Sequence, residues 1–332
     1  MKWNFARCLL PVGFLAAMSA AGCHVHRGAS IDSLAGEAGP SPELPETAYH
    51  IRVLGDSEPS VCIVTQFTPE IYHYANITTP NHRSYAARHG YRYTAFVNRL
   101  TDEFNIPDHD SNVFRDGLYW QSFAALRQVL AEQEVVDKND RCAWLMWVDA
   151  DVVFTDLNRS ATAMLDRWAG QGGFDLADKD VILSREQWQQ QQLINAGVFL
   201  LRNNDAGRQF VRAVIDKFST YGHSCCPEQR AIHAWAFGGD LAWNVHDFEG
   251  SLANLRPNVA MLPQRAMNSF RGWDYDDREE GTKPLWEWQS GDFIAHFVGP
   301  KDAHHSARFE EMQRAASEAE TMGWLGPAEN HD

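Results

Sequence analysis

The stretch WLMWVDADVVF, residues 144–154, is an apolar run that stops for two carboxylates, Asp149 and Asp151, and then resumes. The apolar residues before Asp149 predict a buried strand. In open α/β sheets, ligands bind beyond the carboxyl ends of the strands, which is where these two acids stand. If the strand continued, the single intervening residue would point both carboxylates to the same side. A divalent cation that prefers oxygen ligands, Mg²⁺ or Mn²⁺, would then remove their mutual repulsion.

Two other interpretations of this stretch stay open on spacing alone. The acids can be an exposed pair at a strand end that is neutralised by Arg. The segment DADVV (149–153) also matches the start of haloacid-dehalogenase-like phosphatases, in which the first Asp, here Asp149, is a nucleophile. Such a phosphatase also needs a later Gly-Asp-x-x-x-Asp, and the nearest segment, GDLAWN (239–244), has Asn244 at the last position.

Strand and helix signals alternate along most of the chain. Short apolar runs rich in β-branched residues predict strands, and apolar residues three and four positions apart predict helices. The order strand, helix, strand favours a parallel sheet. The predicted strands are 61–67, 91–97, 142–154, 180–186, 195–203 and 293–299, and the predicted helices are 78–90, 118–133, 161–169, 205–222, 227–237 and about 303–322. We therefore predict one α/β domain over residues 49–325 and a short tail, 326–332.

The N-terminal segment MKWNFARCLLPVGFLAAMSAAGC (1–23) has the layout of a signal peptide or a short membrane anchor. Basic residues precede an apolar stretch that is shorter than the ~20 residues of a spanning helix. Cys23 follows Ala-Ala-Gly, which resembles a bacterial lipoprotein signal with a lipidated Cys23. Residues 24–48, rich in Gly, Pro, Ser and Glu, predict a flexible linker. The remainder is thus expected in a bacterial envelope or in the lumen of the secretory pathway.

The charge of the chain argues against a nucleic-acid partner. The sequence has 29 Lys and Arg against 44 Asp and Glu, a formal net charge of −15. A phosphate backbone would be repelled over most of such a surface. We therefore exclude nucleic acid as a partner, and expect contact with a membrane only through the N-terminus.

Four cysteines follow Cys23, namely Cys62, Cys142, Cys225 and Cys226. The even number is compatible with disulfides in an exported protein, but it is too small for a disulfide scaffold. Cys62 and Cys142 fall in predicted strands, where a buried free thiol is the expected state. Their spacing also does not predict a zinc site.

Five segments far from Asp149 and Asp151 follow one another along the chain: NHRSYAARHGYRY (81–93), YW (119–120), INAGVFLLRN (194–203), Glu228-Gln229 and HFVGPK (296–301). In this order they resemble segments of glycosyltransferase family 34, the galactosyl-, mannosyl- and xylosyltransferase group. The two acids themselves resemble the D-x-D motif of GT-A nucleotide-sugar glycosyltransferases. The resemblance extends over about 240 residues.

The resemblance implies a GT-A fold, a single Rossmann-like α/β domain with a mostly parallel central sheet and a loop-rich C-terminal half. It implies a metal-dependent glycosyltransferase in which Asp149, Asp151 and His296 hold Mn²⁺ or Mg²⁺. The metal would stabilise the charge that develops on the leaving diphosphate. The donor would be a UDP- or GDP-sugar that supplies a hexose or pentose, and the acceptor a glycan or glycoconjugate hydroxyl.

The resemblance also implies roles for residues around the metal site. Family members retain the anomeric configuration, which implies front-face attack with Gln229 beside the oxocarbenium-like centre and Glu228 orienting Gln229 or binding the acceptor. Contacts to the donor are expected from Asp149 and Asp151 and from Thr65, Gln66, Asn195, Gly197 and Lys301. Gly197 would let the backbone approach the ligand closely.

A non-catalytic function is a further alternative. Nucleotide sugars are found in the cytosol and in the Golgi lumen, so a transferase exported to a bacterial periplasm would lack a donor. An envelope protein that keeps a glycosyltransferase fold as a sugar-binding module would avoid this conflict. The sequence leaves this alternative open beside the enzyme and the phosphatase.

Overall fold

The computed structural model describes residues 49–53, 61–104, 118–186, 194–222, 226–239, 252–271, 286–298 and 305–324. The predicted signal segment (1–23), the linker (24–48), the tail (326–332) and Lys301 lie outside these residues. No described helix is both long enough and apolar enough to cross a membrane.

A seven-stranded sheet forms the centre of the molecule, in the order β1-β3-β2-β4-β7-β6-β8. β3, β2, β4, β6 and β8 run in one direction, whereas β1 and β7 run in the other. The mostly parallel sheet predicted from the sequence is therefore confirmed. The strands are β1 Tyr49–Val53, β2 Val61–Phe67, β3 Arg92–Val97, β4 Trp144–Val148, β6 Val181–Ser184, β7 Asn195–Arg202 and β8 Val259–Leu262.

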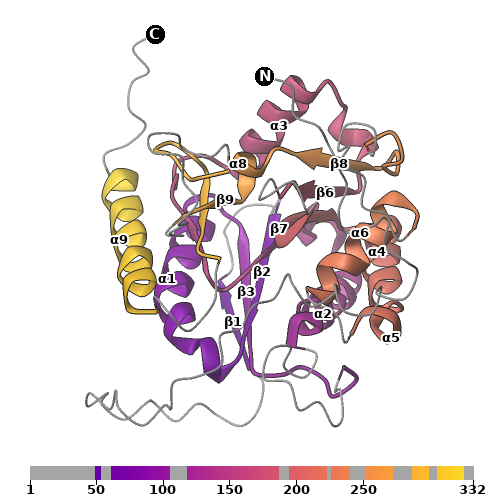
Figure 1. The fold of residues 1–332 in the computed structure, drawn as a ribbon, viewed down its shortest axis with the longest axis horizontal. Helices are drawn as coiled ribbons and strands as arrows, with labels where there is room; N and C mark the ends of the chain where they lie inside the picture. Colours follow the sequence, from indigo (N-terminus) through magenta and orange to yellow (C-terminus); the bar gives the residue numbers. More distant parts are fainter. Residues whose placement is uncertain are drawn as a thin grey trace, which may run out of the picture.

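Helices cover both faces of this sheet. Figure 1 shows α1 and α9 on one side and α2, α4, α5 and α6 on the other. Each side has its own hydrophobic core because neighbouring strand residues alternate between the faces. The helices are α1 Tyr72–Arg88, α2 Gln121–Val135, α3 Ala161–Gly172, α4 Asp205–Ile215, α5 Phe218–Tyr221, α6 Pro227–Phe237, α8 Gln264–Met267 and α9 His305–Trp324. Short 3₁₀ turns occupy Pro69–Ile71, Leu118–Trp120, Lys138–Asp140 and Leu176–Asp178.

A second, three-stranded sheet lies beside the large one and changes the predicted geometry of the two acids. It consists of β5 Val152–Phe154, β10 Ile294–His296 and β9 Ser269–Phe270, with β10 in the middle. The single strand predicted over 142–154 is therefore wrong. The chain turns at Asp149 to Asp151 and passes from β4 in the large sheet to β5 in the small one. The burial of both halves hides this change of sheet in the sequence.

Polar side chains of α1 hold the backbone just after this turn. Thr78 Oγ1 donates to the carbonyl of Ala150 at 2.8 Å, and His82 Nε2 lies 2.8 Å from the carbonyl oxygen of Val152. Asn81 forms two hydrogen bonds with the backbone of Phe154, at 2.8 and 3.0 Å. The three side chains lie on one face of the helix because they are three and four residues apart. They satisfy buried backbone groups that no strand pairs with on that side.

Two helix boundaries differ from the prediction. α1 begins at Tyr72, before the predicted 78, and contains Pro80. Pro80 has no N–H and so removes one hydrogen bond from the helix. Burial of Tyr74, on the same face of the helix as Thr78 and Tyr85, offsets this loss. The predicted helix 205–222 is divided into α4 and α5, and Asn204 rather than Asp205 caps it, through a 2.9 Å hydrogen bond from Gly207 N. Gly90 ends α1 as expected, with φ at 66°.

Burial of the His82 imidazole predicts a stability that falls in acid. His82 is fully buried, its Nδ1 has no partner among the described residues, and burial lowers its pKa from 6.5 to about 4. As the pH falls below 6.5, His82 is therefore protonated in the unfolded chain but still neutral in the folded one. The free energy of unfolding should fall by about 3 kcal/mol by pH 4. Urea titrations of the wild type and of His82→Gln across this range measure the effect. Gln can still donate to Val152, and its curve should be flatter, whereas parallel curves would assign the acid sensitivity elsewhere.

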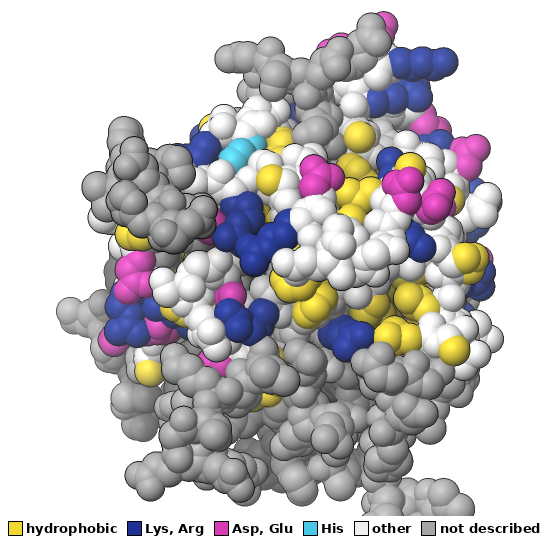
Figure 2. Space-filling model, turned by 90° about the horizontal axis from the view of Figure 1, so that it is seen from above, with side chains coloured by type: hydrophobic (Ala, Val, Ile, Leu, Met, Phe, Trp, Pro, Cys, Tyr) yellow, Lys and Arg dark blue, Asp and Glu magenta, His cyan; other side chains and the backbone are white. Residues whose placement is uncertain are grey.

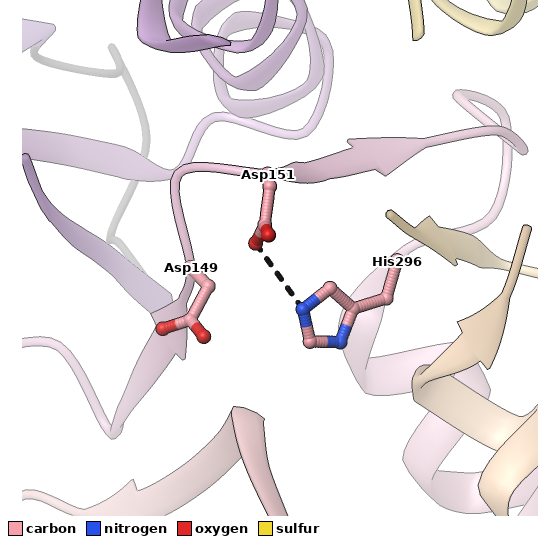
Figure 3. A group of neighbouring side chains, drawn as sticks. All are labelled: Asp149, Asp151 and His296. Carbon is pink, nitrogen blue, oxygen red and sulfur yellow. Dashed lines mark hydrogen bonds and ion pairs between the residues drawn. The ribbon is translucent and has the colours of Figure 1, made fainter. Parts of the chain in front are cut away.

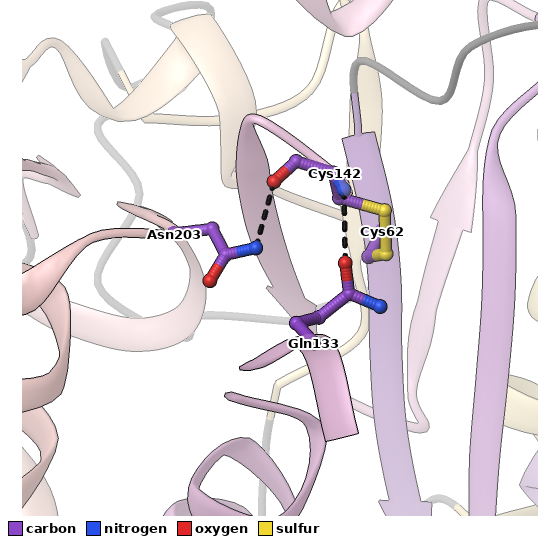
Figure 4. Close-up of a disulfide and its surroundings, with 4 residues drawn as sticks. All are labelled: Cys62, Gln133, Cys142 and Asn203. Carbon is purple, nitrogen blue, oxygen red and sulfur yellow. Dashed lines mark hydrogen bonds between the residues drawn. A yellow bond between two sulfur atoms is a disulfide. The ribbon is translucent and has the colours of Figure 1, made fainter. Parts of the chain in front are cut away.

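Cys62 and Cys142 form a disulfide, which corrects the expectation of buried free thiols. Their Cα atoms are 5.6 Å apart although 80 residues separate them in sequence. The parallel pairing of β2 with β4 brings them together, and this pairing could not be seen in the separate strand patterns. Figure 4 shows Cys142 between two amides: its N–H donates to Gln133 Oε1, and its carbonyl accepts from Asn203 Nδ2, both at 2.9 Å.

Removal of this disulfide should destabilise the protein strongly. A crosslink that closes a loop of this length restricts the unfolded chain and typically contributes about 3 kcal/mol. Both cysteines are buried in the core, so the double variant Cys62→Ala/Cys142→Ala should retain the fold but unfold at lower denaturant. Chemical denaturation of the variant and of the reduced wild type checks this. An unchanged midpoint in both would show that the bond does not form in solution.

The face seen in Figure 2 carries a mixed surface over its described residues. Basic, acidic and hydrophobic side chains are interspersed there, with no single sign of charge over the described area. The excess of acids in the sequence is therefore not gathered on this described face.

Candidate active site

The turn between β4 and β5 is anchored to both sheets. The N–H of Asp149 donates to the carbonyl of Gly197 in β7 at 2.8 Å, so Asp149 stays attached to the large sheet. The carbonyl of Asp151 accepts from Phe297 N at 3.0 Å, so Asp151 is attached to the segment after β10. Each acid is thus fixed by the backbone of a different sheet, at the carboxyl end of β4.

Asp149, Asp151 and His296 form a cluster at this point (Figure 3). Each offers one possible ligand atom, and these atoms lie within 4.8 Å of one another. His296 comes from β10 and its Nε2 is 3.2 Å from Asp151 Oδ1. Asp149 Oδ1 accepts a 2.7 Å hydrogen bond from the indole N–H of Trp147. Two carboxylates and an imidazole are a donor set that fits a divalent ion such as Mn²⁺ or Mg²⁺, and small side-chain movements would let one ion touch all three.

The electrostatics of the two carboxylates differ. Loss of hydration and the neighbouring Asp151 carboxylate raise the pKa of Asp149 to about 8. Burial acts in the same direction on Asp151, but the charge and hydrogen bond of His296, together with Arg308, hold its pKa below the ordinary value. Two negative charges this close are therefore costly without a positive partner.

A chain of side-chain amides fixes the orientation of His296. Gly197 N donates to Asn195 Oδ1 at 2.9 Å, which identifies that atom as the amide oxygen. Asn195 Oδ1 also accepts from Asn268 Nδ2 at 2.5 Å, so the oxygen of Asn268 faces His296 Nδ1, 2.6 Å away. Nδ1 must then carry a hydrogen, because Asn268 Oδ1 can only accept. Nε2, which lies 3.2 Å from Asp151 Oδ1, is then the ring nitrogen that would give its lone pair to a metal ion, once it carries no hydrogen.

The same strand orients a second pair of side chains, Gln229 and Glu186. Ala196 N donates to Gln229 Oε1 at 3.1 Å, so Gln229 Nε2 is the atom that donates to Glu186 Oε2 at 3.2 Å. Asn195 Nδ2 donates to the same oxygen at 2.9 Å. Glu186 is buried, with 8 % exposed, and one of its carboxylate oxygens accepts hydrogen bonds from both amides.

Sequence reasoning missed Asn268 and Glu186. Asn268 is fully buried between α8 and β9, and Glu186 follows β6. Neither residue repeats at a helical or strand spacing with other polar residues, so no periodicity marked them. Glu186 was the last residue of the predicted strand 180–186. This position at the end of a strand was the one available signal for it.

Gly197 is in close contact with His296. A Cβ built at this position would overlap His296 Cε1 and lie 2.8 Å from its Nδ1 and 3.0 Å from Asn195 Oδ1. The space beside Gly197 that a side chain would occupy is therefore filled by the imidazole ring of His296. The absence of a side chain at Gly197 is what allows His296 to lie against β7.

The remaining predicted site residues divide into two groups. Thr65 and Gln66 are consecutive in β2, so their side chains point to opposite faces of the sheet. Gln66 donates to the carbonyl of Asn98 at 3.1 Å, whereas Thr65 Oγ1 is buried without a hydrogen-bond partner in the described part of the chain. Glu228 lies in the first turn of α6 beside Gln229, near enough to Asp149 for its charge to raise the pKa of that acid.

Comparisons with known proteins agree with this architecture. The chain is 22 % identical over 258 residues to an alpha-1,2-galactosyltransferase of Schizosaccharomyces pombe. The matched region covers 69 % of this chain and 57 % of the yeast protein. It is 20 % identical over 277 residues to a protein of the same yeast named an uncharacterized alpha-1,2-galactosyltransferase, with 77 % and 64 % covered. The chain thus spans less than two thirds of the length of either relative. No protein-family model matches the sequence.

Among solved structures, the fold matches a glycosyltransferase involved in the glycosylation of the major capsid of PBCV-1. The TM-score is 0.50 at 14 % sequence identity, and the match covers 77 % of this chain and 100 % of the other. The predicted GT-A fold is confirmed.

Proposed function

We propose that this protein is a metal-dependent, retaining glycosyltransferase that moves a hexose or pentose from a nucleoside-diphosphate sugar to a hydroxyl of a glycan acceptor. The observation that carries the proposal is the cluster of Asp149, Asp151 and His296 beyond β4, in a chain with a glycosyltransferase fold. The similarity to yeast proteins named alpha-1,2-galactosyltransferases supports this reaction class. It also makes galactose the first donor sugar to test.

Asp149, Asp151 and His296 would hold Mn²⁺ or Mg²⁺. When bound, such an ion supplies Lewis-acid stabilisation of the charge that develops on the leaving diphosphate. The chain prepares the site in two ways that support this role. The turn fixes the two acids on separate sheets, and Asn268 holds the imidazole with Nε2 toward Asp151.

Donor contacts are proposed for residues around this cluster. Asn195 and Gly197 line β7 next to His296, and the burial of Thr65 Oγ1 without a described partner is compatible with a ligand contact at the end of β2. Gln66 points to the other face of the sheet, where it can contact the nucleoside beside Trp147. Lys301, outside the described residues, is proposed to meet the diphosphate as a point charge.

Gln229 and Glu228 are proposed as the catalytic residues of a front-face displacement. The Gln229 oxygen accepts a hydrogen bond from Ala196 N, and this oriented amide oxygen would stabilise positive charge at the anomeric carbon. The donation from Gln229 to Glu186 prevents the amide from turning over. The acceptor hydroxyl would lose its proton to the departing diphosphate, with Glu228 positioning that hydroxyl or Gln229.

Export or anchoring by residues 1–23, including lipidation of Cys23, remains part of the proposal. The reaction would then take place in a bacterial envelope or in a secretory lumen, on an exported or membrane-anchored enzyme, with a glycan or glycoconjugate as acceptor. A compartment without nucleotide sugars would favour the alternative of a sugar-binding module.

A direct test incubates the full-length protein with Mn²⁺ and UDP-galactose, UDP-glucose, UDP-xylose or GDP-mannose, with simple glycosides as acceptors. Release of the nucleoside diphosphate, its loss with EDTA, and a product of unchanged anomeric configuration by NMR are expected. Binding of a nucleotide sugar without turnover would support the sugar-binding module. Hydrolysis of phosphomonoesters, with none of these activities, would instead restore the phosphatase interpretation.

A further inference from the structure

Arg308 of α9 lies in the candidate active site although its helix belongs to the C-terminal end of the chain. Its side chain is buried, with 8 % exposed, and its Nη2 is 3.5 Å from Asp151 Oδ2. The guanidinium carbon lies 4.8 Å from the centre of the Tyr74 ring. The stacking on Tyr74 holds the planar guanidinium in a fixed position beside the acid.

The partner of Arg308 distinguishes it from the other arginine that links α9 to the small sheet. Arg271 also stacks on an aromatic ring, that of Trp288, but it is paired with Glu311 at 2.7 Å and Glu318 at 3.1 Å. Those two acids have no part in the candidate site, and Arg271 joins two elements of the fold. Arg308 points instead at a carboxylate that we expect to hold a metal ion.

A guanidinium beside a metal ligand raises an electrostatic question. A divalent ion on Asp151 would place a second positive charge close to Arg308, and buried like charges repel strongly. An anion that contacts both cations removes the repulsion. A diphosphate has the required charge, and its oxygens match the donor fork of arginine better than a single carboxylate does.

We propose that Arg308 binds the diphosphate of the donor together with the metal ion, an assignment that rests on the proposed glycosyltransferase function. It would act on the leaving group, through charge-assisted hydrogen bonds that strengthen as the sugar departs. Asp151 and Tyr74 then serve to hold the guanidinium in place before the donor arrives. This residue is separate from Lys301, which lies outside the described part of the chain.

The competing account is that Arg308 only fixes α9 and neutralises Asp151. The two accounts predict opposite effects on metal binding. A structural arginine, when removed, leaves Asp151 disordered and weakens the binding of both metal and nucleotide. If Arg308 binds the diphosphate, its removal relieves the repulsion of the metal ion and weakens only the binding of the nucleotide.

The experiment titrates Mn²⁺ alone, and then UDP, UMP, GDP and GMP in the presence of Mn²⁺, into full-length protein by calorimetry. Arg308→Met keeps an apolar stem against Tyr74 and loses the charge, whereas Arg308→Lys keeps the charge and loses the fork. Arg314→Met is the control, because Arg314 lies on the same helix with 62 % of its side chain exposed. Thermal melting accompanies each variant.

Arg308→Met should bind Mn²⁺ at least as tightly as the wild type and lose at least about tenfold in affinity for the diphosphate that the wild type binds. The corresponding monophosphate should be affected less, Arg308→Lys should be intermediate, and Arg314→Met unchanged. Equal loss for diphosphate and monophosphate, parallel loss of Mn²⁺, or no loss in either Arg308 variant would overturn the assignment. A wild type that binds neither UDP nor GDP would overturn the proposed function as well, so the two failures are distinguishable.

Discussion

Replacement of Asp149 by Asn is expected to lower the rate of nucleoside-diphosphate release by about 1000-fold or more without lowering the melting temperature. The rate should fall because a carboxylate ligand is lost from the site that stabilises the leaving group. The fold should not suffer, because the change removes one of two neighbouring negative charges and keeps the shape of the side chain. The Trp147 indole can still donate to the amide oxygen of Asn.

The two halves of this prediction are measured separately. Single-turnover release of the nucleoside diphosphate gives the catalytic loss, and calorimetric melting in metal-free buffer gives the stability. Asp166→Asn, at an exposed position of α3, is the matched control and should change neither quantity. A large loss of both activity and stability would mean that Asp149 is a structural acid, whereas full activity would remove it from the metal site.

Local pattern was sufficient for much of the large sheet. β2 has the predicted limits, 61–67, because a continuous apolar and β-branched run is typical of a strand buried on both faces. The position of Asp149 could be predicted in the same way, because the acid follows directly after the apolar run that forms β4. His296 could be joined to these acids only through the resemblance to a glycosyltransferase family, since 145 residues separate it from Asp151.

What the sequence could not reveal depends on pairings between distant segments. The turn at Asp149 and Asp151 is hidden because β4 and β5 are equally apolar, yet they belong to different sheets. The disulfide of Cys62 with Cys142 requires the register of β2 on β4. Arg308 is one of several charged residues in a polar helix, and only the packing of α9 near β5 brings it to the site.

The amide chain shows why a site residue can lack a local signal. Asn268 has no sequence pattern of its own, but its position is determined by Asn195, whose oxygen accepts from the backbone of β7. Orientation thus passes from a backbone N–H through two amides to His296. A residue of this kind is identified by its neighbours, which become known only when the chain has folded.

Replacement of Gly197 by Ala should disrupt the candidate metal site from the backbone side. The added methyl group would overlap the ring of His296, which is buried and held by Asn268, so the ring cannot turn away without losing that hydrogen bond. We expect Mn²⁺ affinity to fall by about 10- to 100-fold, as for other losses of support to a metal ligand. The free energy of unfolding should fall by about 2 kcal/mol, the usual cost of overpacking.

Two further variants separate this collision from a general effect of alanine. Gly170→Ala in α3 meets no atom within 4 Å, and it should leave metal binding unchanged and raise stability by about 0.5–1 kcal/mol through helix propensity. In a His296→Ala background the ring is absent and only the contact with Asn195 Oδ1 is left, so Gly197→Ala should destabilise the fold much less, although metal binding stays weak. Denaturation of the four members of this double-mutant cycle measures the coupling. Additive losses would mean that Gly197 is required for the conformation of β7 itself, and that His296 reaches the two acids without depending on it.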